Sequence, residues 1–410
     1  MTNGGQPLSG VRVLDLTRVF AGPLCTQTLA DLGAEVIKIE RPAKGDDTRG
    51  WGPPFLKGSD GKETSESAYY LSANRGKRSV TLDLAQPAGQ RIARALAEKS
   101  DVLVENYKVG DLARYGLDYA SLRAVNSGIV YCSVTGYGQS GPEAHKPGYD
   151  FIFQGISGLM SITGERDGLP GGGPQKVGIA IGDALTGVHA AVGILAALMH
   201  RRATGIGQHI DVCLLDSLMA FVASQSLSYL VSGKVPKRHG NAHPNVVPYD
   251  AFAAADGHII IAVGNDSQFA SFCAAAGRPA LAQDPRFAQN RGRVENRDAL
   301  MAELVPLLKS RTRRDWIDAL EAANVPCGPI NTVAEAFDEA QVQDRELRKD
   351  IPHPLAGTVP SIANPLRLSA TPVRYDTPPP LLGQHTQDVL RGVLGMGQAE
   401  IEELAEAKVI

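Results

Sequence analysis

Cysteine is scarce in this sequence, with five cysteines scattered over 410 residues. The number is odd and no two cysteines form a Cys-x-x-Cys pair, so neither a disulfide framework nor a zinc cage is indicated. We therefore expect buried thiols in a reducing compartment and no bound metal. The first ten residues, MTNGGQPLSG, have neither a basic n-region nor an apolar h-region, and we expect a cytoplasmic protein.

An excess of charge of either sign is also missing, because 41 Lys and Arg residues stand against 44 Asp and Glu residues. A net charge near zero gives no general electrostatic reason to bind nucleic acid or an anionic membrane. It is compatible with a local basic pocket for one phosphorylated ligand. The most apolar stretch, 184–199, is shorter than the roughly 20 residues of a membrane span and contains Thr186 and His189. We interpret it as a buried core helix and expect a small-molecule partner.

Three common catalytic signatures do not occur in the chain: the GxxxxGK[ST] phosphate loop, the HExxH helix and the GxSxG elbow. A dinucleotide fingerprint is literally present at 136–141, where GYGQSG follows a predicted strand. Its mechanism needs a helix that begins at the third glycine, and here Pro142 opens a turn-like segment. A nicotinamide cofactor is therefore disfavoured.

Short β-branched runs alternate with helical patterns along the first part of the chain. Strands are predicted at 11–16, 35–39, 101–106 and 128–134, and helices at 23–32, 86–100 and 119–126. This order predicts an α/β fold with a doubly wound, Rossmann-like parallel sheet. The loops 17–23, 41–53, 106–116 and 135–150 then lie along the edge where such sheets bind ligands.

The pattern changes after two further predicted helices, 183–202 and 214–231. Asp256-Gly257 lies between two strand-like runs within 249–264, which predicts a hairpin, and three short helices are expected to follow. We expect a large Rossmann-like domain at 1–230 and a smaller α+β domain at 235–330. The segment 331–410, with two short helices after Pro380, is expected to return to the large domain.

Asp183 precedes an apolar helix that has no other charge before Arg201. Asp is a favoured N-cap, so one interpretation is purely structural. The other is a carboxylate that the helix N-terminus keeps ionised beside an apolar pocket, where it is suited to act as a covalent nucleophile. Both interpretations can hold together.

Basic side chains gather in the loops at the predicted ligand edge. Scattered surface cations are usually only solvated, whereas arginines clustered in these loops suit a phosphate or carboxylate site. The cluster comprises Arg18, Arg41, Arg49, Arg75, Lys77, Arg78, Lys108 and Arg114.

Ordered motifs over nearly the whole chain resemble the class III CoA-transferases, the family of formyl-CoA transferase and carnitine CoA-transferase. The motifs are LSGVRVLDLTRVFAGP (8–23), GAEVIKIERPAKGDDTRGW (33–51), NRGKRSVTLDL (74–84), DVLVENYKVGDLARYGL (101–117), GYGQSGP (136–142), PGYD (147–150), GDALTG (182–187), TGIGQHIDV (204–212), VPCGPI (325–330) and LLGQHT (381–386). The resemblance implies that Asp183 is the nucleophile of a ping-pong reaction through an aspartyl-CoA thioester, with coenzyme A as substrate and no metal or nucleotide cofactor. It also implies an interlaced homodimer.

The same resemblance assigns coenzyme A contacts. They are Val19, Phe20, Ala21, Arg41, Leu82, Asn106, Tyr107, Lys108, Arg114, Lys146 and Tyr149. Phe20 stands where formyl-CoA transferase has a glutamine, and HGNAHPN (239–245) replaces a run of glycines, so oxalate and formate are disfavoured as substrates. The segments DDTRGWGPPF, YYLSANRGKRS and PPPLLGQHT are more similar to the branch that moves CoA between succinate and glutarate.

A dicarboxylate keeps one free carboxylate, which needs a cation when it is buried. We expect residues in the segments DDTRGW and NRGKRS and in 239–245 to recognise the substrate. Arg49 and Arg75 are alternative ligands for the distal carboxylate. The expected substrate residues are Arg49, Trp51, Arg75, Gly240, Asn241 and His243. Two alternatives stay open: an α-methylacyl-CoA racemase, whose added histidine is replaced here by Tyr149, and a non-catalytic CoA-binding protein, which would not need Asp183.

Overall fold

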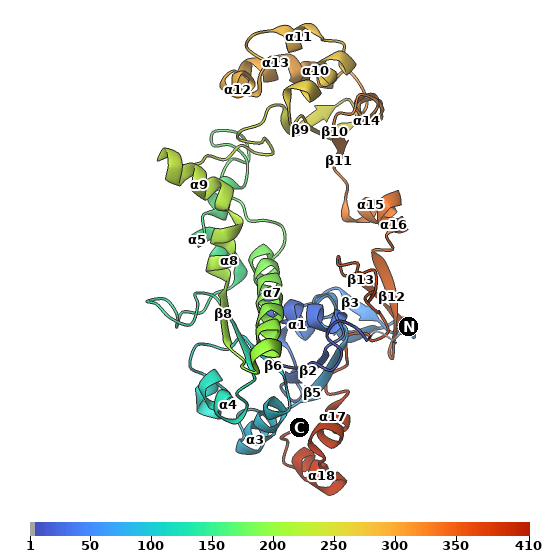
Figure 1. Ribbon diagram of the computed structural model, residues 1–410. Coiled ribbons are helices and arrows are strands. Elements are labelled where there is room, and N and C mark those ends of the chain that lie inside the picture. Colours follow the sequence, from blue (N-terminus) through green and yellow to red (C-terminus); the bar gives the residue numbers. More distant parts are fainter. Residues whose placement is uncertain (1–4) are drawn as a thin grey trace. The chain divides into compact units, whose positions relative to one another are not determined.

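The computed structural model describes residues 5–410, and these fold into two compact units (Figure 1). The large unit comprises residues 5–158, 177–226 and 343–410, and the small unit comprises 159–176 and 227–342. Residues 343–410 belong to the same unit as the first part of the chain. The domain boundaries expected near 230–235 and 330 stay predictions.

The large unit is built on one parallel sheet of six strands in the order β5-β2-β1-β6-β7-β8. The strands are β1 Arg12–Asp15, β2 Glu35–Glu40, β5 Lys77–Thr81, β6 Val102–Glu105, β7 Val130–Thr135 and β8 His209–Cys213. Counted within the sheet, this is the 3-2-1-4-5-6 order of doubly wound dinucleotide-binding folds. The predicted α/β, Rossmann-like fold is confirmed, and the strand order reverses between β1 and β6.

Helices cover both faces of this sheet. One core contains Val13, Val36 and Val102 together with helices α1 (Ala21–Asp31) and α7 (Ile181–Thr204). The neighbouring strand residues, among them Leu14 and Ile37, belong to the opposite core, which is closed by helices α3 Pro87–Glu98, α4 Tyr119–Val125, α17 Thr386–Leu394 and α18 Gln398–Glu406. Burial on both faces explains why the inner strands are rich in apolar residues.

By length and composition, helix α7 is long and apolar enough to cross a membrane. Within residues 5–410, α8 (Leu214–Phe221) and α9 (Ala223–Ser232) reach that length and apolar character only when the bent pair is counted as one span. In the large unit, α7 places Ala190, Ala191, Ile194 and Ala197 in the core against α1, as a core helix does. The single helix expected over 214–231 is wrong, because the chain breaks at Val222 into α8 and α9.

Shorter elements complete the large unit around the edge of the sheet. They are η1 Asp47–Gly50, the hairpin β3 Phe55–Lys57 and β4 Glu63–Ser67, α2 Ala68–Leu71, η2 Leu112–Tyr115, α5 Asp150–Ile156, and the hairpin β12 Arg348–His353 and β13 Gly357–Ile362. Helix α16, Ala340–Asp344, crosses from the small unit into the large one.

The small unit has an antiparallel sheet in the order β11-β10-β9. The predicted hairpin is confirmed as β9 Tyr249–Ala254 and β10 Gly257–Ala262, and β11 Cys327–Pro329 joins its edge. Five helices rather than three lie between β10 and β11: α10 Asp266–Ala275, α11 Ala280–Gln283, α12 Asn290–Glu295, α13 Arg297–Leu308 and α14 Arg313–Ala322. The remaining helices are α6 Leu159–Ile162 and α15 Val333–Asp338. Trp316 is fully buried in the core and donates its indole N–H to the Leu308 carbonyl at 2.8 Å.

Candidate active site

A pocket of about 260 Å³ lies in the large unit beyond the carboxyl ends of β1, β6 and β7. This is the point where the strand order reverses, which is where doubly wound sheets bind their ligands. Nine of the expected catalytic and coenzyme A residues line it together: Val19, Phe20, Ala21, Asn106, Tyr107, Lys108, Lys146, Tyr149 and Asp183. The fold therefore brings the proposed nucleophile and most of the expected coenzyme A contacts to one place.

A second pocket of about 200 Å³ shares Arg18 and Tyr107 with the first and contains the expected contacts Arg41 and Leu82. Between the two pockets, the Asp47 carboxylate pairs with Arg18 Nη1 at 2.9 Å and with Arg41 Nη2 at 2.5 Å. The sequence analysis placed Arg18 among the loop cations but not among the coenzyme A contacts. Its position between the pockets now makes it a candidate for that role.

Several expected site residues lie outside both pockets, and Arg114 and Trp51 are two of them. The Arg114 side chain is exposed and pairs with Asp111 at 2.9 Å. Trp51 packs edge-on against Tyr69, whose ring also meets Phe20. For Arg114 the role of a phosphate ligand stays a prediction.

Asp183 lies in the first turn of α7, three residues after the N-cap Ala180, so the interpretation of Asp183 as N-cap is wrong. Asp150 caps the helix instead, since its Oδ1 accepts from Gly182 N at 2.6 Å and from Asp183 N at 3.2 Å. A Cβ at position 182 would lie 2.8 Å from this oxygen and 2.9 Å from Leu218, which explains the glycine before Asp183. The helix start thus brings two carboxylates together.

This arrangement changes the electrostatics expected for Asp183. Burial and, second, the nearby Asp150 carboxylate raise the pKa of Asp183 from 3.8 to about 7. The expected preference for the ionised form at a helix N-terminus is therefore outweighed. A carboxylate with a pKa near neutrality in a pocket is a typical functional group.

Tyr69 was missed as a site residue by the sequence analysis, although it lies in the quoted motif YYLSANRGKRS. Burial and, after it, the charges of Asp183 and Asp150 raise the pKa of Tyr69, and its ring meets that of Phe20 in the pocket. Aromatic residues are common in helices and give no pattern that separates a site tyrosine from a core one. Only the folded position identifies it.

Each nitrogen of the Arg49 guanidinium group already donates to an acceptor within the protein. Its Nε pairs with Glu40 at 2.8 Å and its Nη1 with Glu66 at 2.9 Å, and all three side chains are buried. Its Nη2 donates to Tyr70 Oη at 2.6 Å and to the Pro380 carbonyl at 3.0 Å. The expectation that Arg49 binds a distal carboxylate is therefore corrected, since protein acceptors already use this cation.

Arg75 is anchored in the same way. Its Nε and Nη2 bind both oxygens of Asp31, at 2.8 and 2.6 Å, and its Nη1 donates to the Ile362 carbonyl at 2.7 Å and to Ser361 Oγ at 3.0 Å. Arg75 also lines a different pocket from Asp183. The role of a loop anchor fits these contacts, and the role of substrate ligand does not.

The three remaining expected substrate residues lie in a loop of the small unit. Arg297 Nη2 donates to the carbonyls of His243 and Pro244 at 2.7 and 2.9 Å, which fixes the loop backbone. Gly240 has a φ of 64° and lies beside Glu165. The roles of Gly240, Asn241 and His243 toward a substrate stay predictions.

Gly136 of the literal dinucleotide fingerprint lines the pocket, but residues 141–149 form no helix that could receive a pyrophosphate at its N-terminus. Within residues 5–410, no group of three His, Cys, Asp or Glu side chains is placed to hold a metal ion.

Comparison with known proteins gives a consistent result. Residues 8–386 match CoA-transferase family III. The chain is 48% identical to a succinate–glutarate CoA-transferase of Agrobacterium fabrum, over 95% of this chain and 96% of that protein. It is 42% identical to a human succinyl-CoA:glutarate CoA-transferase, over 100% of this chain and 91% of that protein.

A solved structure agrees with the sequence matches. The crystal structure of a CAIB/BAIF family protein from Brucella suis is 44% identical in sequence, with a TM-score of 0.84 over 95% of this chain and all of that one. With its doubly wound sheet and its pocket at the strand reversal, the chain thus belongs to CoA-transferase family III and is a CoA-transferase that uses CoA thioesters as substrates.

Proposed function

We propose that this enzyme transfers CoA from succinyl-CoA to a short dicarboxylic acid such as glutarate, with Asp183 as the nucleophile. The observation that supports this most directly is the position of Asp183 in one pocket with the expected coenzyme A loops. The names of the relatives from Agrobacterium fabrum and human supply the substrate pair.

The reaction begins when a carboxylate oxygen of Asp183 attacks the thioester carbonyl of succinyl-CoA. The C–S bond breaks, the CoA thiolate leaves, and a succinyl–aspartyl anhydride forms. The thiolate then attacks the Asp183 carbonyl and releases succinate, which leaves an aspartyl-CoA thioester. Glutarate attacks this thioester, and the two steps run in reverse to give glutaryl-CoA and free Asp183.

Coenzyme A is proposed to lie across the two adjoining pockets of the large unit. Arg41 and Lys108, with Arg18 between the pockets, are the cations that meet its phosphates in this proposal. Phosphate contacts by arginine are strong because the guanidinium binds two oxygens at once. In the free protein Arg18 and Arg41 pair with the Asp47 carboxylate, and on binding they would exchange this carboxylate for phosphate.

A homodimer is proposed as the working assembly. Helices α5 and α7 expose large apolar side chains, among them Phe151, Val192 at 59% and Met199 at 76% of full exposure. Apolar side chains in such number on neighbouring helices are typical of a protein interface. A second copy of the chain is the partner that the family resemblance suggests, and a cytoplasmic location, which fits five free cysteines, stays part of the proposal.

The proposed substrate is tested with succinyl-CoA as donor and a panel of acids as acceptors. We expect kcat/KM for glutarate to exceed that for butyrate by about 100-fold or more, because a site built for a second carboxylate is left unpaired by a monocarboxylate. Thioester formation is followed by chromatography of the CoA products. Equal rates for butyrate and glutarate would contradict the dicarboxylate proposal, and exchange of the α-proton without CoA transfer would favour the racemase.

The pH dependence tests the electrostatics of Asp183. The carboxylate is the nucleophilic form, so kcat/KM should rise with pH and level off above a pKa of about 7, with about a tenth of the plateau value at pH 6. Asp150→Asn removes the neighbouring charge and lowers the pKa of Asp183, which shifts the acid limb of the profile to lower pH. A profile that is flat down to pH 5 in the unmodified enzyme would contradict this prediction.

A further inference from the structure

Val19 has an unusual backbone conformation. Its φ is 73°, in the left-handed region, and within residues 5–410 it is the only β-branched residue with a positive φ. A branched side chain in this region is strained and persists only when its surroundings impose it. Val19 also lines the pocket that contains Asp183, so the strain lies in the loop that approaches the ligand.

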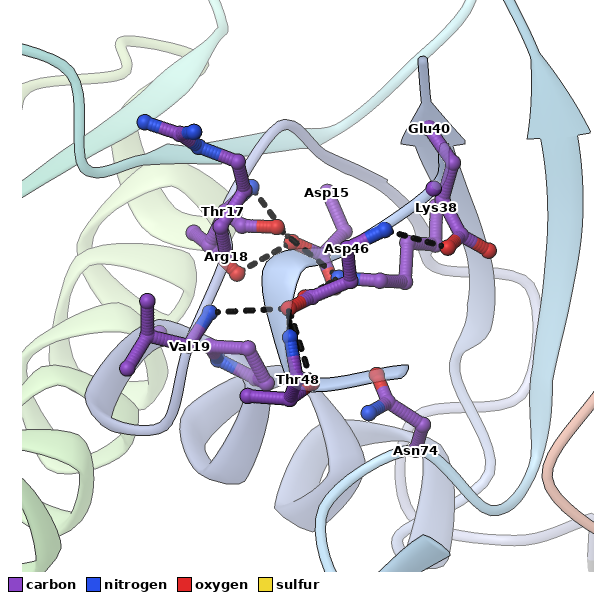
Figure 2. A network of polar contacts seen from close by, with 12 residues as sticks. Asp15, Thr17, Arg18, Val19, Lys38, Glu40, Asp46, Thr48 and Asn74 are labelled. Atoms are coloured by element: carbon purple, nitrogen blue, oxygen red, sulfur yellow. Dashed lines mark hydrogen bonds and ion pairs between the residues drawn. The ribbon is translucent and has the colours of Figure 1, made fainter. Parts of the chain in front are cut away.

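Asp46 is the group that holds this backbone (Figure 2). Its Oδ1 accepts from Val19 N at 3.2 Å and also from the backbone and side chain of Thr48, at 3.0 and 2.8 Å. Its Oδ2 accepts from Lys38 Nζ at 2.9 Å. One carboxylate therefore connects the loop after β1 to β2 and to η1.

Lys38 extends the restraint to the start of the loop. Its Nζ donates to the Thr17 carbonyl at 2.8 Å, and Thr17 N and Oγ1 donate to Asp15 at 2.9 and 2.6 Å. Both side chains of the Lys38–Asp46 pair have 0% of their surface exposed. A buried pair that is fully hydrogen-bonded keeps its geometry, because separating the charges is costly.

From the other side, β6 supports the same loop. Asn106 Oδ1 accepts from Arg18 N at 3.0 Å, and Asn106 Nδ2 donates to the Arg18 carbonyl at 2.7 Å. The peptide groups of residues 17 to 19 are thus bound from β1, β2, η1 and the end of β6. Burial alone would raise the pKa of Asp46, but Lys38 and the Thr48 hydrogen bonds lower it to about 2, so the restraint remains charged at neutral pH.

We propose that Asp46 is a positioning residue for coenzyme A binding: its carboxylate holds Val19 in the left-handed conformation that shapes the pocket. This inference rests on the proposed function, since it takes coenzyme A as the ligand. The hydrogen bonds of Asp46 offset the backbone strain at Val19. A residue that adopts this φ without strain would therefore not need Asp46.

The experiment is a mutant cycle with Asp46→Ala and Val19→Gly, and the readout is the Kd of coenzyme A measured by calorimetry. Asp46→Ala should weaken binding by about 10- to 100-fold, because the strained loop relaxes away from the pocket. Glycine reaches a positive φ without a steric cost. The double variant should therefore bind coenzyme A within about threefold of Val19→Gly alone.

Asp31→Ala is the matched control, because Asp31 also forms a buried ion pair in the large unit but pairs with Arg75 away from the pocket. It should lower the melting temperature and leave the Kd of coenzyme A within about twofold. If Asp46→Ala does not fold, Asp46→Asn takes its place in the cycle, since the amide keeps the size of the side chain and loses the charge that binds Lys38.

Three outcomes decide between the proposals. Rescue of coenzyme A affinity by Val19→Gly supports the positioning role. Additive losses in the double variant, or an equal loss in Asp31→Ala, overturn it and leave Asp46 as a general stabilising residue. Failure of the unmodified enzyme to bind coenzyme A at all would instead contradict the proposed function.

Discussion

Asp183→Asn should abolish CoA transfer and, at the same time, make the protein more stable at pH 8. The amide cannot attack the thioester as a carboxylate does, and loss of a covalent nucleophile lowers kcat by a factor of about 10⁴ or more. The rate is measured with succinyl-CoA and glutarate, and binding of coenzyme A by calorimetry should remain. The substitution removes activity but increases stability, because a buried, ionised Asp183 destabilises the folded state.

The stability gain depends on pH in a defined direction. Well below pH 3.8 the carboxyl is protonated in both the folded and the unfolded chain, so the substitution has little effect. Between the ordinary pKa of 3.8 and the folded value of about 7, the unfolded chain ionises first, and the folded state becomes progressively less favoured. Above pH 7 the cost reaches its full value, up to about 4 kcal/mol. Urea unfolding at pH 4 and pH 8 measures the difference.

Asp388→Asn is the matched control, since Asp388 also lies in the first turn of a helix but is exposed on α17. It should leave both transfer and the pH dependence of stability nearly unchanged. Transfer by Asp183→Asn at the unmodified rate would place the nucleophile elsewhere. If Asp183→Asn and the unmodified enzyme had the same free energy of unfolding at pH 8, the ionised Asp183 would not destabilise the folded state.

The four inner strands of the large sheet could be predicted from the sequence, and its two edge strands, β5 and β8, could not. Strands β1, β2, β6 and β7 are covered on both faces, so they are rich in apolar and β-branched residues. The edge strand β8 reads HIDVC and alternates between exposed and less exposed residues. A short, partly polar strand gives little hydrophobic signal, and only the neighbouring β7 defines it.

The site shows a similar division. Asp183 could be found because it is the one charge in a long apolar segment, and the ligand edge because its loops follow the predicted strands. The individual coenzyme A contacts are those that the family resemblance implies. Asp150 and Tyr69 became visible only when the fold brought them beside Asp183. The electrostatics could not be predicted either, because a helix N-terminus is seen in the sequence, whereas burial and a second carboxylate from a distant segment are not.

Arg49 shows how a correct residue can receive the wrong role. From its place in DDTRGW it was expected to bind the distal carboxylate, and the structure instead pairs it with Glu40 and Glu66 inside the large unit. Arg49→Gln should therefore destabilise the protein by about 3–5 kcal/mol, because two buried carboxylates lose their shared cation. The free energy of unfolding is measured in urea at pH 7.

Arg291→Gln is the control for this prediction, because Arg291 forms an exposed pair with Glu295 and its loss should cost less than about 1 kcal/mol. A second variant, Arg49→Gln with Glu66→Gln, should recover part of the lost stability by removing one of the two stranded charges. In all of these variants that fold, the ratio of kcat/KM for glutarate to that for butyrate should stay unchanged. If Arg49→Gln kept its stability and lost this selectivity, the guanidinium would serve the substrate after all, and the ion pairs with Glu40 and Glu66 would have to open during turnover.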